Sequence, residues 1–216
     1  AVIFLSNHCK ISQLFQNQLI KITELMRSKK VAIVAVSPNY YKAVLPDEQA
    51  YSDLGDSFIE MKKRALRKNY NFPYLFDGEK QTLTRKIGVK ITPSVFLYNK
   101  KRELVYAGRI GNHDLPESLQ ASDLYKFITS YTDGGGHKLK RTKVFGTAIK
   151  FSGDLLLAEQ VRKRYSDETV RITAADERKL KFYINHKTGK PKLFYVWKET
   201  DMDVRDNLLT ISAIYK

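Results

Sequence analysis

The hydrophobic pattern of the first half of the chain alternates between short apolar runs and segments with helical spacing. An apolar run over residues 2–5 is followed by apolar residues at helical intervals over 10–28. A β-branched run over 31–37 has no polar alternation, which is typical of a strand buried on both faces. This pattern predicts a strand, a helix and a buried strand, in that order.

The same alternation continues to about residue 131. The further predicted elements are a polar loop over 38–53, a helix with Leu54, Phe58, Met61 and Ala65 on one face, a strand over 72–76, a short helix near 79–87, a hairpin of 95–98 with 103–107, and a helix over 121–131. Strands and helices in this order are typical of an α/β fold in which helices flank a mixed sheet.

The remainder of the chain is less regular and predicts two further regions. Three consecutive glycines, Gly134 to Gly136, precede a basic cluster, and together they predict a flexible basic linker over 132–153. Residues 154–216 predict a helix over 155–164, strands over 170–174 and 193–197, and a last helix containing Val204 and Tyr215. The predicted domains are therefore 1–131, a linker over 132–153, and 154–216.

Composition and charge restrict the class of protein. Apolar residues make up 43% of the 216 positions, which is enough for a packed core. The net charge of +15 is compatible with a solvated basic linker, an anionic surface as partner, or nucleic acid. No DNA- or RNA-reading motif accompanies the charge, so we favour the linker and expect no nucleic-acid partner. No apolar run approaches the roughly 20 residues of a membrane span.

The only cysteine, Cys9, lies where the first strand turns into the first helix. The amide groups of a helix N-terminus and the neighbours His8 and Lys10 favour a thiolate, which is the reactive form of the side chain. The alternative is a small buried apolar residue, which is the commoner role of a free cysteine. His8 either carries a proton for this thiol or is a loop histidine without a catalytic task.

Other catalytic chemistry has no support in the sequence. The histidines are scattered, and with a single cysteine no spacing predicts a metal site. No phosphate-binding loop, dinucleotide fingerprint or Ser-His-Asp signature is present. We therefore expect neither a metal nor a cofactor.

Three segments, taken together, carry a resemblance to a known family. The segment Ser6-Asn7-His8-Cys9 resembles a Cys-Asn-His-Cys site, residues 72–77 resemble a Phe-Pro-(Tyr/Leu)-Leu-x-Asp segment, and residues 87–93 resemble a Tyr-Gly-Val-x-x-Thr-Pro motif. In this order and spacing, residues 1–131 resemble the redoxin branch of the thioredoxin-like superfamily, the alkyl hydroperoxide reductase and thiol-specific antioxidant type.

The resemblance implies a fold, a site and an activity. The fold is a thioredoxin-like mixed sheet flanked by helices. Cys9 is the nucleophile, Ser6 and His8 are its neighbours, and Thr92 and a cis Pro93 form the substrate-facing loop. The implied activity is a thiol-dependent oxidoreductase in redox homeostasis. It acts on a protein or small thiol, a disulfide or a peroxide, and an external thiol reduces it. Relatives of this kind are often exported, which favours the bacterial cell envelope.

The departures from the family pattern support an alternative function. Ser6 and Thr147 stand where relatives carry further cysteines, so no resolving thiol is present. Residues 187–197 resemble the segment before a thioredoxin site, and both cysteines of that site are replaced, at Asp201 and Val204. Residues 154–216 are therefore predicted as a partial, redox-dead thioredoxin-like module. The alternative is a degenerate peptide- or protein-binding module without turnover; the missing thiols favour it, while Cys9 and the proline loop favour the enzyme.

Overall fold

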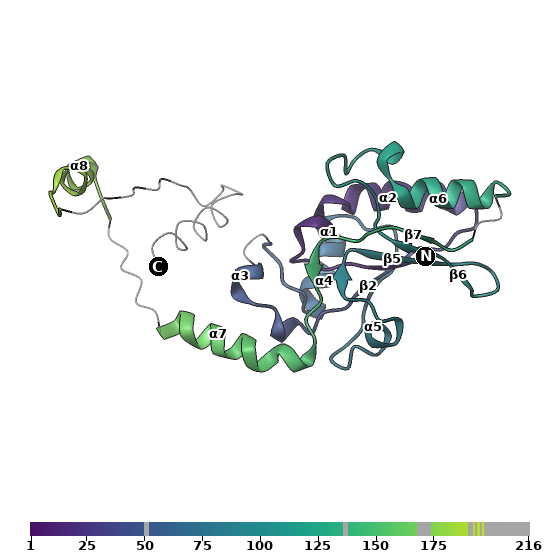
Figure 1. Ribbon diagram of the computed structural model, residues 1–216, viewed down its shortest axis with the longest axis horizontal. Helices are drawn as coiled ribbons and strands as arrows, with labels where there is room; N and C mark the ends of the chain where they lie inside the picture. Colours follow the sequence, from purple (N-terminus) through teal and green to yellow (C-terminus); the bar gives the residue numbers. More distant parts are fainter. Residues whose placement is uncertain are drawn as a thin grey trace. The chain divides into compact units, whose positions relative to one another are not determined.

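The computed structural model describes residues 1–49, 52–135, 138–167 and 174–189, together with Lys192, Phe194 and Val196. The chain divides into two compact units, Ala1–Lys163 and Arg164–Lys216 (Figure 1). The first unit contains the sheet and all of the candidate site residues.

A mixed sheet of six strands forms the centre of the first unit. Its strands are β1 (Val2–Phe4), β2 (Val34–Ser37), β3 (Tyr74–Phe76), β5 (Ser94–Tyr98), β6 (Leu104–Gly108) and β7 (Lys140–Arg141), in the order β3-β2-β1-β5-β6-β7. The pairs β1–β2, β2–β3 and β6–β7 are parallel, whereas β1–β5 and β5–β6 are antiparallel. A separate pair of short antiparallel strands joins β4 (Ile91–Thr92) to β8 (Thr147–Ala148).

Helices cover the sheet and connect its strands. They are α1 (Lys10–Leu14), α2 (Gln16–Ser28), α3 (Pro46–Gln49), α4 (Phe58–Arg67), α5 (Thr82–Ile87), α6 (Asp123–Thr132) and α7 (Leu155–Asp167), with single 3-10 turns at Tyr41–Ala43, Leu119–Ala121 and Ser152–Asp154. In Figure 1, α2 and α6 lie on one face of the sheet and α5 on the other.

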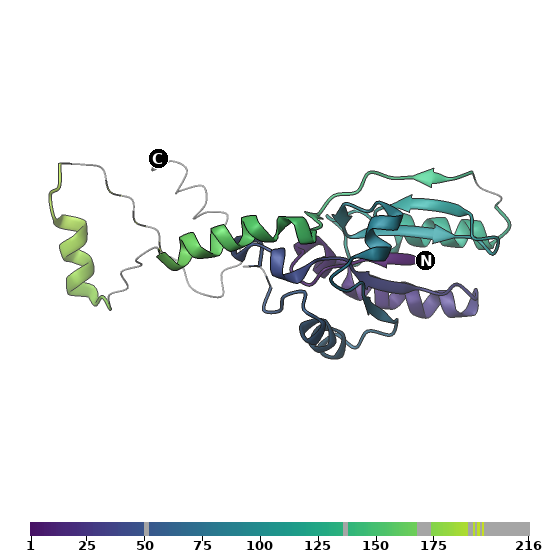
Figure 2. The same ribbon diagram turned by 90° about the horizontal axis from the view of Figure 1, so that it is seen from below.

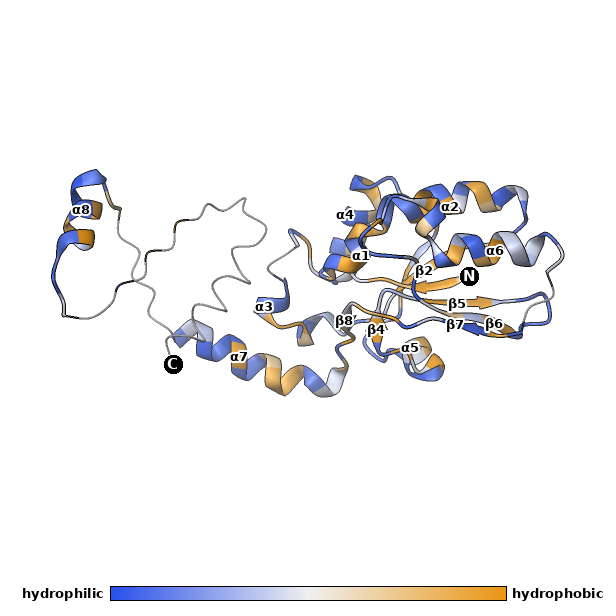
Figure 3. Cartoon of the chain, turned by 45° about the horizontal axis from the view of Figure 1, so that its top comes forward, coloured by the Kyte–Doolittle hydropathy of each residue, from blue (hydrophilic) through white to orange (hydrophobic). Residues whose placement is uncertain are grey.

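The alternation of side chains along β1 divides the core into two clusters. Ile3 faces α2 and α6, where it joins the larger cluster of buried residues. Phe4 faces the opposite side and packs with Val36, Val89 and Ile149. Figure 3 shows the hydrophobic residues of α2 and α6 as orange stripes on helices that are otherwise polar. The expected α/β architecture, a mixed sheet flanked by helices, is therefore present.

Several predicted elements differ from the observed ones. The helix predicted to carry Leu54 and Phe58 on one apolar face begins only at Phe58, whose side chain is exposed, and the predicted loop over 38–53 contains α3. The helix over 10–28 is broken into α1 and α2 at Phe15, whose backbone has φ −90° and ψ 0°. The apolar pattern gives no sign of the break because Phe15 is itself buried in the core. The strand over 31–37 begins only at Val34, because the amide of Val31 donates to Met26 and helps to close the end of α2.

The segment predicted as a linker, 132–153, belongs to the first unit and is held to its sheet at a few points, although most of its described residues are exposed. Figure 2 shows it in green, running along the sheet as β7 before it reaches α7. Arg141 pairs with Ala107 of β6, Thr147 pairs with Thr92 of β4, and Ile149 is buried. Charge and glycine content indicated a solvated linker. Backbone pairing with β6 and β4, together with the burial of Ile149, holds the segment to the sheet instead.

In the second unit the structure describes one helix in full, α8 (Glu177–Asn185), which Asp176 caps by accepting from the amide of Lys179. The helix predicted over 155–164 is confirmed as α7. The predicted strands and last helix, with Asp201 and Val204, lie almost entirely outside the described residues. The thioredoxin-like module over 154–216 therefore stays a prediction.

Candidate functional site

Cys9 lies just beyond the carboxyl end of β1 and forms the N-cap of α1. Its Sγ accepts a hydrogen bond from the amide of Ser12 at 3.4 Å, which satisfies one of the donors at the start of the helix. Its thiol donates to the carbonyl oxygen of Thr92, with Sγ and O 3.1 Å apart. The side chain has no exposed surface, so in this conformation the sulfur is shielded from solvent.

The loop around Thr92 and Pro93 lies directly against the cysteine. The peptide bond between these two residues is cis, as the sequence led us to expect. The hydroxyl oxygens of Ser6 and Thr92 are 2.8 Å apart and hydrogen bonded. The structure thus brings Ser6, Cys9, Thr92 and Pro93 together, although 83 residues separate Cys9 from Thr92 along the chain.

His8 takes part in a buried polar network centred on Asp56. The Nδ1 atom of His8 is 2.6 Å from one carboxylate oxygen of Asp56, and the Asn39 side-chain amide donates to the same oxygen at 2.8 Å. The backbone amide of Asn7 donates to the other oxygen at 2.6 Å. Three donors therefore compensate the burial of this carboxylate.

The network fixes the orientation of the imidazole. A carboxylate on Nδ1 places the proton there and leaves Nε2 as an acceptor. Nε2 of His8 is buried and has no hydrogen-bond partner among the described residues. Buried polar atoms of this kind are uncommon in folded proteins, so Nε2 is a candidate for transient proton transfer.

Tyr74 supports the same loop from β3. Burial, reinforced by the negative charge of Asp56, raises the pKa of Tyr74 well above its usual value, so the phenol stays protonated. Its hydroxyl lies at the outer limit of hydrogen-bond distance from the Leu5 carbonyl and the Asn7 side-chain oxygen, at 3.4 and 3.5 Å. The uncharged Tyr74 side chain therefore packs against the loop that precedes Cys9 and helps to hold it in place.

A segment of the chain's own backbone occupies the edge of β4. We call residues 142–152 the strap. Within it, Thr147 pairs with Thr92 and Ala148 pairs with Ile91, and the amide of Ile149 donates to the Lys90 carbonyl at 2.8 Å. Figure 3 shows β4 and β8 side by side. Thr147 thus lies opposite Thr92, whose carbonyl oxygen contacts Cys9.

Gly146 makes the closest approach of the strap to the site. Its φ of +147° belongs to a region that side-chain-bearing residues rarely adopt. A Cβ atom at this position would lie 2.0 Å from the carbonyl oxygen of Thr92, the same oxygen that Cys9 contacts. Only glycine therefore permits this packing.

The strap is also held downstream of β8. The amide of Lys150 donates to the Asn39 side-chain oxygen at 2.8 Å, and the Lys150 carbonyl accepts from Tyr40 and from the Gln81 side chain. Gln81 is fully buried and also accepts from the amide of Ser152 at 3.1 Å. Asn39 thus connects the strap to Asp56 and, through it, to His8.

Sequence reasoning missed Asp56, Asn39 and the position of the strap. Asp56 immediately precedes Ser57 and Glu60, which form a capping box at the start of α4, so its acidic side chain suggests a helix start. Nothing in the local pattern pairs it with His8, 48 residues away. The only hint of the strap was the expectation, from the family resemblance, that Thr147 stands at the position of a further cysteine.

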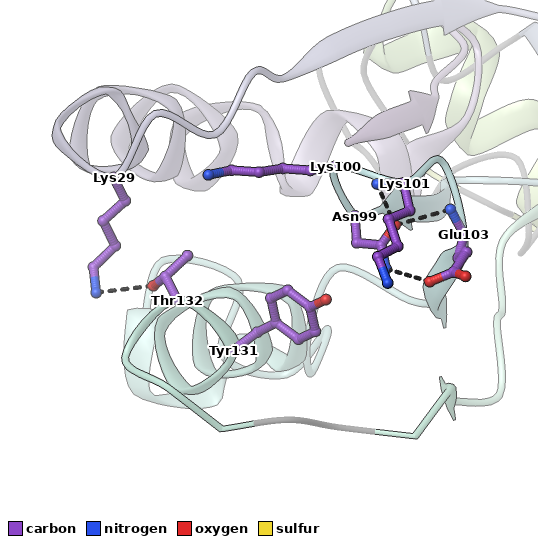
Figure 4. Close-up of a pocket in the computed structure, with 7 residues that line it drawn as sticks. All are labelled: Lys29, Asn99, Lys100, Lys101, Glu103, Tyr131 and Thr132. Atoms are coloured by element: carbon purple, nitrogen blue, oxygen red, sulfur yellow. Dashed lines mark hydrogen bonds between the residues drawn. The ribbon is translucent and has the colours of Figure 1, made fainter.

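A cavity lies at the other end of the sheet, beside the turn between β5 and β6. Its volume is about 550 Å³, and it is lined by Lys29, Asn99, Lys100, Lys101, Glu103, Tyr131 and Thr132 (Figure 4). Asn99 donates to Glu103 at 2.7 Å, and Lys29 donates to Thr132 at 3.0 Å. We call this cavity the lysine pocket.

The described residues contain no group of three or more His, Cys, Asp or Glu side chains that could hold a metal ion. In the same part of the chain, no helix combines the length and apolar character needed to cross a membrane.

Comparisons with known proteins bear on the fold. No family model matches the chain, and no curated protein matches it. A crystal structure of a hypothetical protein from Sinorhizobium meliloti 1021 is 25% identical, with a TM-score of 0.57 over 70% of this chain and 78% of that one. An uncharacterized conserved protein from Geobacillus kaustophilus is 24% identical, with a TM-score of 0.59 over 70% of this chain and 76% of that one. The likeness supports the α/β fold.

Proposed function

We propose that residues 1–131 form a thioredoxin-like domain of the redoxin type and that the protein is a thiol-dependent oxidoreductase with Cys9 as its nucleophile. One observation carries the proposal: the sulfur of Cys9 caps a helix and contacts the carbonyl of Thr92, directly before a cis proline. A helix N-terminus favours negative charge on sulfur, and the thiolate is the attacking species.

The proposed step is thiol–disulfide exchange. The Cys9 thiolate attacks one sulfur of a substrate disulfide, the S–S bond breaks, and the second sulfur leaves as a thiolate that takes up a proton. An external thiol then attacks the mixed disulfide and releases Cys9. With a peroxide, the thiolate attacks one oxygen, the O–O bond breaks, and water or an alcohol leaves; two external thiols return the resulting sulfenic acid to the thiol.

In this proposal His8 handles the proton and Asp56 positions His8. The acceptor atom Nε2 of His8 takes the proton that the thiol loses, and the carboxylate on Nδ1 stabilises the imidazolium that forms. The base and its orienting carboxylate are in place, but the nucleophile–base hydrogen bond is not formed in this conformation, because the thiol donates to Thr92 and Nε2 of His8 has no partner among the described residues.

The need for an external thiol follows from the residues around Cys9. Ser6 and Thr147 supply hydroxyl groups where a resolving thiol would stand, and both lie against Thr92. Because the chain has one cysteine, it forms no internal disulfide. The family resemblance favours the cell envelope as the compartment of this reaction.

A binding module without turnover is the second candidate function. The observation that favours it is the complete burial of Cys9, together with the absence of a partner thiol. Such a module would bind an extended peptide at the edge of β4, in the place that the strap occupies here.

The two candidates differ in what Cys9 does with a disulfide. We expect the folded protein to form a mixed disulfide with oxidised glutathione at Cys9, to be detected by intact mass, and to release it on addition of reduced glutathione. The Cys9→Ser variant should remain unmodified. A wild-type thiol that reacts only after denaturant unfolds the protein would contradict the enzyme and favour the binding module.

A further inference from the structure

The sulfur of Cys9 and the backbone of Gly146 lie against the same atom. The thiol donates to the carbonyl oxygen of Thr92 at 3.1 Å, and a Cβ atom on Gly146 would overlap that oxygen. The strap is thus an immediate neighbour of the nucleophile. It also forms the backbone pair with Thr92 that an extended substrate would otherwise form.

The two halves of the strap are held unequally. Downstream, Ile149 is 5% exposed, and Lys150 and Ser152 bond to the buried side chains of Asn39 and Gln81. Upstream, Gly146 and Ala148 are exposed. The upstream half is held by the two-residue pairing of β8 with β4 and by Phe145, whose ring packs on His113 and Arg109. Segments with few buried contacts open at lower free energy than the core around them.

We propose that residues 145–148 form a gate over Cys9, which lifts from β4 before the thiol reacts. The gate opens between two fixed points. Thr142 is fixed to the sheet, because its Oγ1 accepts from the Arg109 amide at 2.9 Å and bonds the Tyr106 hydroxyl at 3.0 Å. Ile149 is fixed by burial in the core. As an account of how substrate reaches Cys9, the gate rests on the proposed function; as a property of the fold, it does not.

The hydrogen bond that holds the strap at Lys150 also connects it to His8. Lys150 bonds Asn39, which in turn bonds the carboxylate that orients the imidazole. Because Lys150 lies beyond the gate, lifting residues 145–148 exposes the sulfur and leaves the His8–Asp56 pair in place. The site is therefore organised before the substrate arrives.

The substitution Gly146→Ala tests the gate directly. The added methyl group cannot share the space of the Thr92 carbonyl, and alanine disfavours the positive φ, so the variant destabilises the closed gate. Gly153→Ala is the matched control, since a Cβ there meets no atom within 4 Å. The measurement is the rate at which iodoacetamide alkylates Cys9 in the folded protein, read by intact mass, with thermal unfolding curves to show that each variant is folded.

We expect Gly146→Ala to raise the alkylation rate by about tenfold or more, because a shift of about 1.4 kcal/mol in the opening equilibrium is a factor of ten. Gly153→Ala should react at the wild-type rate. A folded Gly146→Ala protein that reacts no faster than the wild type would overturn the proposal, as would an equal acceleration in the control.

A second variant closes the gate instead of opening it. Ile91 and Ala148 are directly opposed in the antiparallel pair, and opposed residues there are within reach of a disulfide. In the double variant Ile91→Cys/Ala148→Cys, the oxidised bridge should slow alkylation of Cys9 by about tenfold or more relative to the reduced protein. Peptide mass mapping reads Cys9 alone and verifies the bridge. An unchanged rate in the bridged protein would overturn the gate even if Gly146→Ala fails to fold.

Failure of the gate and failure of the proposed function are distinguishable. If Gly146→Ala alkylates faster but forms no mixed disulfide with oxidised glutathione, the gate stands and the redox function falls. If wild type and Gly146→Ala form the mixed disulfide at equal rates, the redox function stands and the gate falls.

Discussion

The two ends of the sheet in the first unit place polar groups in opposite environments. At the Cys9 end, His8, Asn39 and Asp56 are almost fully buried, and the Asp56 carboxylate receives three hydrogen bonds. At the other end, the lysine pocket is lined by exposed side chains such as Lys100 and Lys101, and its residue Lys29 forms an ion pair with the largely exposed Asp133 nearby.

This difference shows that the free-energy cost of losing a hydrogen-bond partner depends on whether the polar group is buried. A buried polar group that loses its partner is left with an uncompensated desolvation penalty, whereas an exposed charge is simply hydrated. The net charge of +15 therefore does not by itself locate the candidate site. The candidate chemistry lies at the end where a few neutral or paired groups are buried.

The largest expected effect is the removal of the carboxylate at the centre of the buried network. Asp56→Ala leaves the Asn7 amide, His8 and Asn39 without their acceptor, and should destabilise the fold by about 3–5 kcal/mol. At the lysine pocket, Asp133→Ala removes an exposed partner of Lys29 and should cost less than about 1 kcal/mol. Urea unfolding of both variants measures the contrast; equal losses would contradict it.

The second effect concerns the anchor of the strap. Ile149→Ala removes a buried side chain from the cluster around Phe4, and should cost about 2–4 kcal/mol. It should also speed alkylation of Cys9. Leu139→Ala, which lies just before the strap and is 42% exposed, should change stability by no more than about 0.5 kcal/mol. If the Ile149 variant is as stable as the Leu139 variant, the strap is not anchored as described.

A smaller loss of stability is expected at Thr142, the residue that fixes the upstream end of the strap to the sheet. Thr142→Val keeps the shape of the side chain but removes the oxygen that accepts from Arg109 and donates to Tyr106, which should cost about 1–2 kcal/mol. Thr132→Val at the exposed lysine pocket is the control and should cost less. Thermal unfolding curves of the two proteins, compared with the wild type, give the difference; a neutral Thr142 variant would remove this anchor.

The smallest effect appears only at alkaline pH. Burial raises the pKa of Tyr106 to about 12 from its usual 10. The unfolded chain thus loses this proton first, and the stability contributed by the neutral phenol is complete below pH 10 and lost as pH rises towards 12. Tyr106→Phe should lower stability at neutral pH, because it loses the bond to the Arg109 carbonyl, but should show a shallower decline over this range. An unchanged slope in urea titrations would contradict the assignment.

The sequence predicted most of the elements because each carries its own periodic pattern. The hairpin of β5 and β6, the buried β2 and the amphipathic α6 were all visible in this way. The break at Phe15 was not, since a buried aromatic residue continues the apolar spacing through it. The candidate site was predicted in part: Cys9, Ser6, Thr92 and Pro93 were named, and the structure brings them together.

The remaining parts of the site depend on contacts between distant segments. Asp56 meets His8 across 48 residues, and Thr92 lies 55 residues before Thr147. Local propensity carries no information about such pairs. The glycine run and the basic cluster that precede the strap favour a solvated linker, and nothing in the local pattern shows that the strap pairs with the edge of β4.

The rate at which Cys9 forms a mixed disulfide with oxidised glutathione in the folded wild-type and Gly146→Ala proteins tests the central claim most directly, with Cys9→Ser as the blank. A nucleophilic thiol behind a gate predicts that both folded proteins form the mixed disulfide and that Gly146→Ala forms it faster. No mixed disulfide in either folded protein would contradict the nucleophile, and identical rates would contradict the gate.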